Sequence, residues 1–152
     1  MKYWVIILIA FPLLAAADVS TKEISRDRVL SEGPEWQQNY DNFKPDPGKI
    51  EALKEKTGTG LSIDIYLGFW CPDSRKSVPP FLRIIESAGS AVPVRYISVA
   101  RKPVKQIRYF VDAVQVERVP TFIFYREDKE IGRIVEHPQA GLIEDTMAIL
   151  SK

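Results

Sequence analysis

The sequence has little cysteine and little histidine, with one residue of each, Cys71 and His137. A single cysteine excludes an internal disulfide and a Cys-x-x-Cys redox pair. A lone histidine with no cysteine or second histidine nearby is a poor basis for a metal site, so we expect no metal and no cofactor. Cys71 is therefore either an inert buried residue or a thiol that reacts with a partner outside the chain.

An excess of charge of either sign is also missing. The chain holds 21 Lys and Arg against 20 Asp and Glu, which gives a formal net charge of +1. Such a balance provides no electrostatic reason to expect nucleic acid or an anionic membrane surface as a partner. The length of 152 residues and a hydrophobic fraction of 45% are those of one globular domain.

The long hydrophobic run that is present lies at the N-terminus. A lysine precedes the apolar residues 3–14, and the small residues Ala15 and Ala17 follow. This order of segments is typical of a signal peptide with an A-x-A cleavage site. The run is shorter than the ~20 residues of a spanning helix, and Pro12 interrupts it, which argues against the alternative of an uncleaved anchor. We expect residues 1–17 to be a signal peptide and the protein to be periplasmic or secreted, without stable membrane insertion.

Residues 18–47 are predominantly polar and are interpreted as an N-terminal extension, with the main domain at residues 48–152. Within the extension, Trp36, Tyr40 and Phe43 recur at helical spacing. This pattern predicts a short helix, and we expect its aromatic side to pack on the domain rather than to form a docking surface.

Hydrophobic periodicity predicts the elements of the main domain. Apolar residues alternate with other residues over 61–69, a pattern typical of a strand. The expected order is a helix at 49–56, a strand at 61–69, a helix at 72–88, a strand at 92–100, a helix at 103–114, a hairpin at 120–136 and a helix at 140–150. Pro79 and Pro80 are expected to bend the second of these helices. Helices between strands imply parallel pairing, and the hairpin adds an antiparallel edge, so we expect an α/β fold with a mixed central sheet and helices on both faces.

The stretch "FWCPDSRKSVPP" (69–80) resembles the active site of the thioredoxin family, Trp-Cys-x-x-Cys-Lys/Arg at a strand-to-helix turn. Pro79 matches the proline that bends the active-site helix of the family. The sequence Val119-Pro120-Thr121 matches its Ile/Val-Pro-Thr motif, in which the proline bond is cis. The segment "KEIGRIVE" is similar to the last strands of the family. This resemblance, over roughly residues 60–150, implies a thioredoxin-like three-layer sandwich.

The chain departs from the family pattern at two positions. Ser74 stands where the family has its second cysteine, and Ile65 stands where it often has a buried acid. Asp64 is one residue away from that acid position, so it should point to the opposite face of the strand. The sequence, including that of the N-terminal extension, also resembles exported bacterial thioredoxin-like proteins with Trp-Cys-x-Asp-Ser in place of a dithiol.

The resemblance and the position of Cys71 together suggest roles for the site. Cys71 should lie at a helix N-terminus, where backbone N–H groups stabilise a thiolate. We expect Ser74 to donate a hydrogen bond to the sulfur, although it could instead cap backbone groups. Asp73 and Arg75 are expected to tune the thiolate, or else to be ordinary solvated helix residues. The residues expected to contact substrate are Trp70, Pro72, Val119 and Pro120.

One thiol can attack a disulfide but cannot resolve the product by itself. The leading hypothesis is therefore monothiol thiol–disulfide exchange through a mixed disulfide at Cys71, with protein or low-molecular-weight thiols and disulfides as partners. The alternative is a redox-inactive binding or chaperone-like module on the same fold. Oxidation of Cys71 to sulfenic acid with external rescue is a third outcome. We expect the protein to be a monomer.

Overall fold

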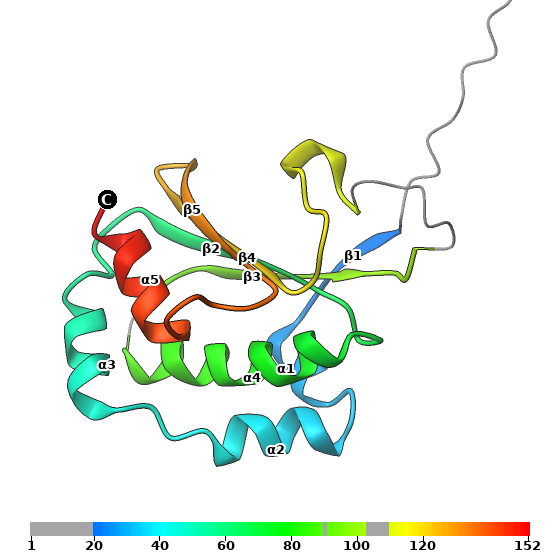
Figure 1. Ribbon diagram of the computed structural model, residues 1–152, viewed down its shortest axis with the longest axis horizontal. Helices are drawn as coiled ribbons and strands as arrows, with labels where there is room; N and C mark the ends of the chain where they lie inside the picture. Colours follow the sequence, from blue (N-terminus) through cyan, green and yellow to red (C-terminus); the bar gives the residue numbers. More distant parts are fainter. Residues whose placement is uncertain (1–19, 90, 103–109) are drawn as a thin grey trace, which may run out of the picture.

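The computed structural model describes residues 20–89, 91–102 and 110–152 (Figure 1). The predicted signal peptide at 1–17 lies outside these residues, as do residues 103–109 of a predicted helix. Within the described ranges, no helix has both the length and the apolar character needed to span a membrane. The elements in chain order are β1 (Thr21–Ile24), α1 (Arg26–Leu30), α2 (Pro34–Asn42), α3 (Pro47–Lys54), β2 (Leu61–Leu67), α4 (Pro72–Ser87), β3 (Val94–Val99), the 3₁₀ helix η1 (Asp112–Val114), β4 (Thr121–Arg126), β5 (Lys129–Val135) and α5 (Leu142–Leu150).

The five strands form one mixed sheet in the order β1-β3-β2-β4-β5. β2 pairs with β3 in parallel and with β4 antiparallel, and β1 and β5 are antiparallel edge strands. The β4–β5 hairpin turns at Glu127 and Asp128, whose φ angles of 50° and 63° fit the left-handed turn that a tight hairpin favours. The predicted α/β fold class with a mixed central sheet is confirmed.

One face of this sheet carries the main hydrophobic core. The alternation of β2 directs Ile63, Ile65 and Leu67 to this face, where they pack with residues of all the α-helices. Phe81 of α4 lies against Phe122 of β4, with ring centroids 4.5 Å apart. In Figure 1 these helices lie on one side of the sheet, with α4 next to the strands and α2 beyond it.

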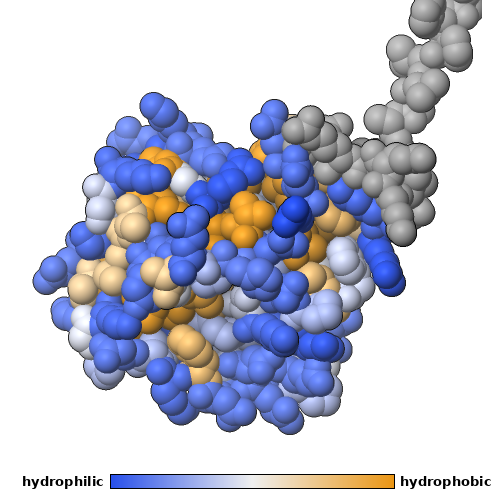
Figure 2. All heavy atoms as spheres, in the orientation of Figure 1, coloured by the Kyte–Doolittle hydropathy of each residue, from blue (hydrophilic) through white to orange (hydrophobic). Residues whose placement is uncertain are grey.

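The opposite face carries a smaller cluster that includes Tyr66, Cys71, Phe110 and Ile123. Among the described residues no α-helix covers this face, and most of the helix predicted at 103–114 lies outside those residues. The described end of the helix predicted at 103–114 forms a β-bridge at Val111 and the short η1. Figure 2 shows hydrophobic residues near the centre of an otherwise mainly hydrophilic view of the molecule.

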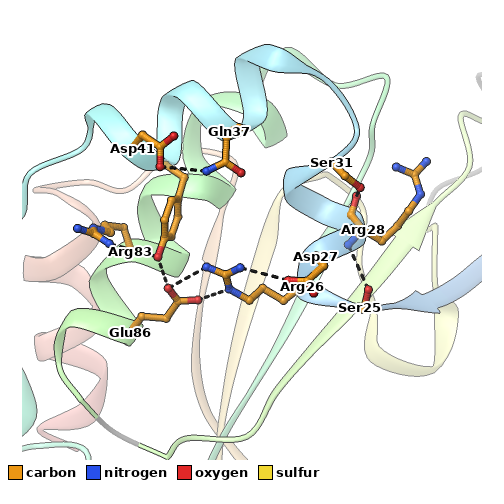
Figure 3. Close-up of polar contacts among 10 residues, drawn as sticks. Ser25, Arg26, Asp27, Arg28, Ser31, Gln37, Asp41, Arg83 and Glu86 are labelled. Carbon is orange, nitrogen blue, oxygen red and sulfur yellow. Dashed lines mark hydrogen bonds and ion pairs between the residues drawn. The ribbon is translucent and has the colours of Figure 1, made fainter.

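The N-terminal extension is part of the same packed unit. β1 pairs with β3 at the sheet edge, and Ser25 caps α1 by accepting a hydrogen bond from the Arg28 N–H (Figure 3). Trp36 and Tyr40 of α2 are buried in the main core, and Phe43 packs against it. The prediction that this aromatic cluster packs on the domain is confirmed.

Candidate functional site

Cys71 occupies the junction between the sheet and α4. Its N–H donates to Gly68 O at 2.9 Å, which closes the turn after β2, and its carbonyl accepts from the Arg75 N–H at 3.2 Å, which begins the helix. Pro72 follows at the first helical position, where a missing N–H costs nothing. Cys71 is thus the N-cap residue of a 16-residue helix, as the sequence predicts.

The sulfur of Cys71 faces the loop that precedes β4. Cys71 Sγ lies 3.1 Å from the Val119 carbonyl oxygen, to which its S–H donates a hydrogen bond. The Val119–Pro120 peptide bond is cis, as the resemblance implies. The fold therefore brings together Cys71, Val119 and Pro120, which are distant in sequence. The cysteine is 7% exposed.

Ser74 anchors the turn and does not contact the sulfur. It is fully buried, and its Oγ accepts a hydrogen bond from the Gly68 N–H at 3.1 Å. Within the described ranges, no hydrogen bond joins Ser74 to Cys71, so the expected support of the thiolate by this hydroxyl is not what the geometry shows. The alternative role, capping a backbone group, is the one observed. Its physical reason is that a buried N–H needs an acceptor.

Trp70 lies beside the cysteine with one side open to solvent. It is 41% exposed, and its indole N–H donates to Val99 O at 2.9 Å. A Cβ at position 68 would come within 2.8 Å of the indole, so Gly68 is required for this placement. Arg101 lies over the Trp70 ring at 6.0 Å, which places a positive charge at this edge of the site.

Asp73 and Arg75 have partners away from the sulfur. The Arg75 guanidinium Nε lies 2.8 Å from a carboxylate oxygen of Glu35 in α2. Asp73 Oδ2 lies 4.0 Å from His137 Nε2, which the turn after β5 brings to the N-terminal end of α4. Neither side chain has a described contact with Cys71. Arg75 therefore joins α2 to α4.

A second contact from α2 compensates for the proline within α4. Pro79 has no N–H, so it cannot bond the carbonyl of Arg75 one helical turn before it. The Asn39 side-chain amide donates to this carbonyl at 2.9 Å. Sequence reasoning missed Asn39, Glu35 and Gly68. The available signal was the proline in the helix interior, which leaves a carbonyl that must find a donor elsewhere.

Asp64 does not act in place of the missing buried acid. Its side chain is buried and is held by Arg95 of the neighbouring strand, whose Nε lies 2.7 Å from Asp64 Oδ1. Ile65, at the acid position, belongs to the main core on the other face. This confirms that the two side chains point to opposite faces of β2. In the part of the chain that the structure describes, no group of three His, Cys, Asp or Glu residues could hold a metal ion.

Comparison with known proteins agrees with this architecture. A family model described as thioredoxin matches residues 20–147, which includes the N-terminal extension as well as the site. A search of curated protein sequences found no match. Among solved structures, the chain is similar to a 1.5 Å crystal structure of a protein of unknown function from Pseudomonas aeruginosa, with a TM-score of 0.64 and 16% sequence identity. The similarity covers 85% of this chain and 92% of the other. The family match extends over most of the chain and includes the cysteine turn and the cis-proline loop, so the chain belongs to the thioredoxin family.

Proposed function

We propose that the protein carries out monothiol thiol–disulfide exchange with Cys71 as the nucleophile. The observation that supports this proposal is the position of the sulfur, at the N-cap of α4 and 3.1 Å from the carbonyl that precedes cis-Pro120. Helix N-termini stabilise negative charge, and thiolate is the reactive form of cysteine. The chain has no second cysteine, so it can form a mixed disulfide but cannot resolve it without an external thiol.

The exchange consists of two displacement steps. Cys71 loses its proton to solvent, and the thiolate attacks one sulfur of a disulfide R–S–S–R′. A Cys71–S–S–R bond forms, the R–S–S–R′ bond breaks, and R′–S⁻ leaves with the electron pair and takes a proton. An external thiol R″–SH then attacks the mixed disulfide as its thiolate, releases Cys71 and forms R–S–S–R″. No net oxidant is consumed, because one disulfide enters and one leaves.

The Val119 carbonyl connects substrate binding to the state of the sulfur. In the free protein this oxygen accepts the hydrogen of the Cys71 thiol. An extended substrate segment that pairs with the Val119 backbone would donate its own N–H to the same oxygen. Trp70, with 41% of its surface exposed, would form the adjacent wall. Substrate binding would then free the sulfur at the moment when a disulfide is present.

We further propose that the protein acts outside the cytoplasm, in the periplasm or as a secreted protein. This proposal depends on residues 1–17, whose order of a basic residue, an apolar run and small residues is that of a signal peptide. Disulfides persist in such compartments, so both the substrates and the resolving thiols would be available there.

The experiment is the reaction of the purified protein with oxidised glutathione, followed by intact mass. We expect one glutathione per chain, its complete release by an added thiol, and no adduct on a Cys71→Ser variant. A Ser74→Cys variant tests the geometry, because a second thiol at this position should permit reduction of insulin disulfides. Absence of an adduct on the folded wild-type protein would contradict the proposal.

A second candidate is a redox-inactive binding module on the thioredoxin fold. The burial of Cys71 favours it, since the cysteine is 7% exposed and its hydrogen-bonding capacity is already used by Val119. On this hypothesis the groove beside Pro120 binds a client without covalent chemistry. Client binding that is unchanged in Cys71→Ser would support this candidate, and binding that is lost in that variant would support exchange.

A further inference from the structure

Arg101 differs from the other described arginines in its partners. It is exposed, and its guanidinium lies over the Trp70 ring, 6.0 Å from the ring centroid. Among the residues that the structure describes, it makes no ion pair and no hydrogen bond. Each of the other described arginines has at least one, and Arg75 and Arg118, for example, pair with glutamates. The N–H donors of Arg101 are therefore available to a ligand.

The contact with Trp70 connects this charge to the thiol site. Trp70 immediately precedes Cys71, and its indole N–H donates to the carbonyl of Val99, the last residue of β3. Arg101 is two residues beyond Val99, so the same strand end positions both the ring and the cation. Phe110 packs on Trp70 with ring centroids 5.9 Å apart, and it belongs to the cluster that contains Cys71. Arg101 therefore lies on the tryptophan wall of the site.

A guanidinium in this position is suited to bind a carboxylate. Its N–H groups lie in the plane of the group, so an aromatic ring against its face leaves them free, and their fork matches the two oxygens of a carboxylate. The next residue, Lys102, lies over the Phe110 ring at 4.1 Å from the centroid and adds a second positive charge. The Trp70 side of the site is thus lined by two aromatic rings, each with a cation over it.

The nearby carboxylates have other partners. Pairing with Glu136, at 2.7 Å, raises the pKa of Arg118, and the charge of Glu117 adds to this effect. Asp73 lies 4.0 Å from the imidazole on the turn after β5. Within the described ranges, none of these carboxylates pairs with Arg101.

We propose that Arg101 selects disulfides that carry a carboxylate close to a sulfur atom, and that it binds this carboxylate while Cys71 attacks. The inference rests on the exchange proposed above and names its substrate class. The Cys71 thiolate forms a bond to one sulfur, the other sulfur leaves with the electron pair and takes a proton, and the carboxylate on Arg101 undergoes no bond change. The carboxylate belongs either to a small acidic disulfide or to an acidic residue beside a cysteine of a protein segment.

The test compares three small disulfides: anionic dithiodipropionate, neutral bis-hydroxyethyl disulfide and cationic cystamine. The second-order rate of adduct formation at Cys71 is measured by intact mass for the wild type and for Arg101→Gln. The intrinsic reactivity of each disulfide cancels in the ratio of the two rates, and the neutral compound reports any effect of Arg101 on the thiolate itself. We expect the wild-type-to-variant ratio for dithiodipropionate to exceed the neutral ratio by about threefold or more, and the ratio for cystamine to lie below it.

Two outcomes would contradict different parts of the account. Equal ratios for the three disulfides would overturn the selection by Arg101 and leave the exchange standing. Absence of an adduct on the wild type with all three would overturn the exchange itself, and the selection with it.

Lys129→Gln is the matched control, because it also removes an exposed positive charge. Lys129 pairs with Arg126, which pairs with Leu61 at the start of β2, whereas Cys71 follows the end of that strand. The control charge therefore lies at the opposite end of the sheet, and its removal should give equal ratios for the three disulfides. A preference for dithiodipropionate that falls as much in Lys129→Gln as in Arg101→Gln would assign the effect to net charge and overturn the proposal.

Two peptide disulfides that differ only in Asp or Asn beside the cysteine distinguish the two sources of the carboxylate. A preference for the Asp peptide that is lost in Arg101→Gln would support an acidic protein segment as the substrate. A preference that depends on Arg101 for dithiodipropionate alone would support a small acidic disulfide.

Discussion

The two faces of the central sheet differ in how they are held. On one face, all the described α-helices pack into a single core that includes Phe81 and Phe122. On the other, a smaller cluster formed with the segment around Phe110 surrounds the cysteine turn. Cys71 belongs to the smaller cluster, whereas Ser74, one turn along the same helix, is fully buried. The helix-covered face therefore holds α4, and with it the sulfur, in position, whereas the described residues of the other face place side chains but no α-helix around the sulfur.

The largest change in stability is expected from a Phe→Ala substitution in the main core, and the same substitution in the smaller cluster tests whether the two faces differ. Phe122→Ala removes a fully buried ring from the main core and should lower the free energy of unfolding by about 3–5 kcal/mol. Phe110→Ala, in the smaller cluster beside Trp70, should cost about 1–2 kcal/mol and should expose Cys71 to alkylation. Urea denaturation measures both. Equal losses of stability would mean that the two faces do not differ as described.

Ser74→Ala tests whether the hydroxyl anchors the turn. The substitution leaves the Gly68 N–H without its acceptor in a buried place, and should cost about 1–3 kcal/mol. Ser77→Ala is the matched control, because Ser77 lies in the same helix and its side chain makes no hydrogen bond among the described residues; it should stay within about 0.5 kcal/mol of the wild type. A Ser74→Ala protein as stable as this control would contradict the anchoring role.

High pH distinguishes tyrosines on the two faces. Burial raises the pKa of both Tyr96, on the helix-covered face, and Tyr125, on the other face, to about 12. A tyrosine whose pKa is raised in the folded protein stabilises the fold at pH values below its unfolded pKa of about 10. This contribution is lost as the pH rises from about 10 to 12. Because both residues are partly exposed, we expect a loss of about 1–2 kcal/mol for Tyr96 and less for the more exposed Tyr125.

The measurement is chemical denaturation at pH 9, 10 and 11 for wild type, Tyr96→Phe and Tyr125→Phe. The alkaline loss of stability should become smaller in Tyr96→Phe than in Tyr125→Phe. The reverse order would mean that Tyr125, and not Tyr96, is the more strongly buried tyrosine, which would contradict the described difference between the faces.

A small effect is expected from the link between α2 and α4. Asn39→Ala removes the donor that replaces the missing N–H of Pro79, and should cost about 1 kcal/mol. Asn42→Ala, at an exposed position of the same helix, controls for the loss of an amide and should have little effect. Thermal denaturation compares the two. If both variants have the melting temperature of the wild type, the hydrogen bond from α2 to the Arg75 carbonyl does not contribute to stability.

Much of the fold could be predicted from local signals. The alternation of β2, the Trp-Cys turn, the Val119-Pro120 loop and the closing hairpin each carry their own sequence pattern, and each forms where expected. β1 could not be predicted, because its sequence Thr-Lys-Glu-Ile has one apolar residue and forms a strand only by pairing with β3. Tertiary pairing outweighs weak local preference at such an edge.

The candidate site was predicted in its residues but not in all its contacts. Cys71, Val119 and cis-Pro120 meet as expected. The partner of Ser74 could not be foreseen, because a buried hydroxyl can serve either the sulfur or a backbone group, and sequence does not show which lies closer. Arg75 likewise faces Glu35 of α2, a contact that depends on how the extension folds back on α4.

A comparison of two thiols in one helix shows whether the fold makes Cys71 a nucleophile. The reference is a Cys71→Ser, Lys76→Cys protein, which places an ordinary thiol at an exposed position of α4. The second-order rate of reaction with oxidised glutathione at pH 7 is measured for each protein. We expect Cys71 to react at least about tenfold faster than the reference thiol, despite its burial. A rate equal to or below that of the reference would contradict it and would leave a thioredoxin fold whose cysteine has only a packing role.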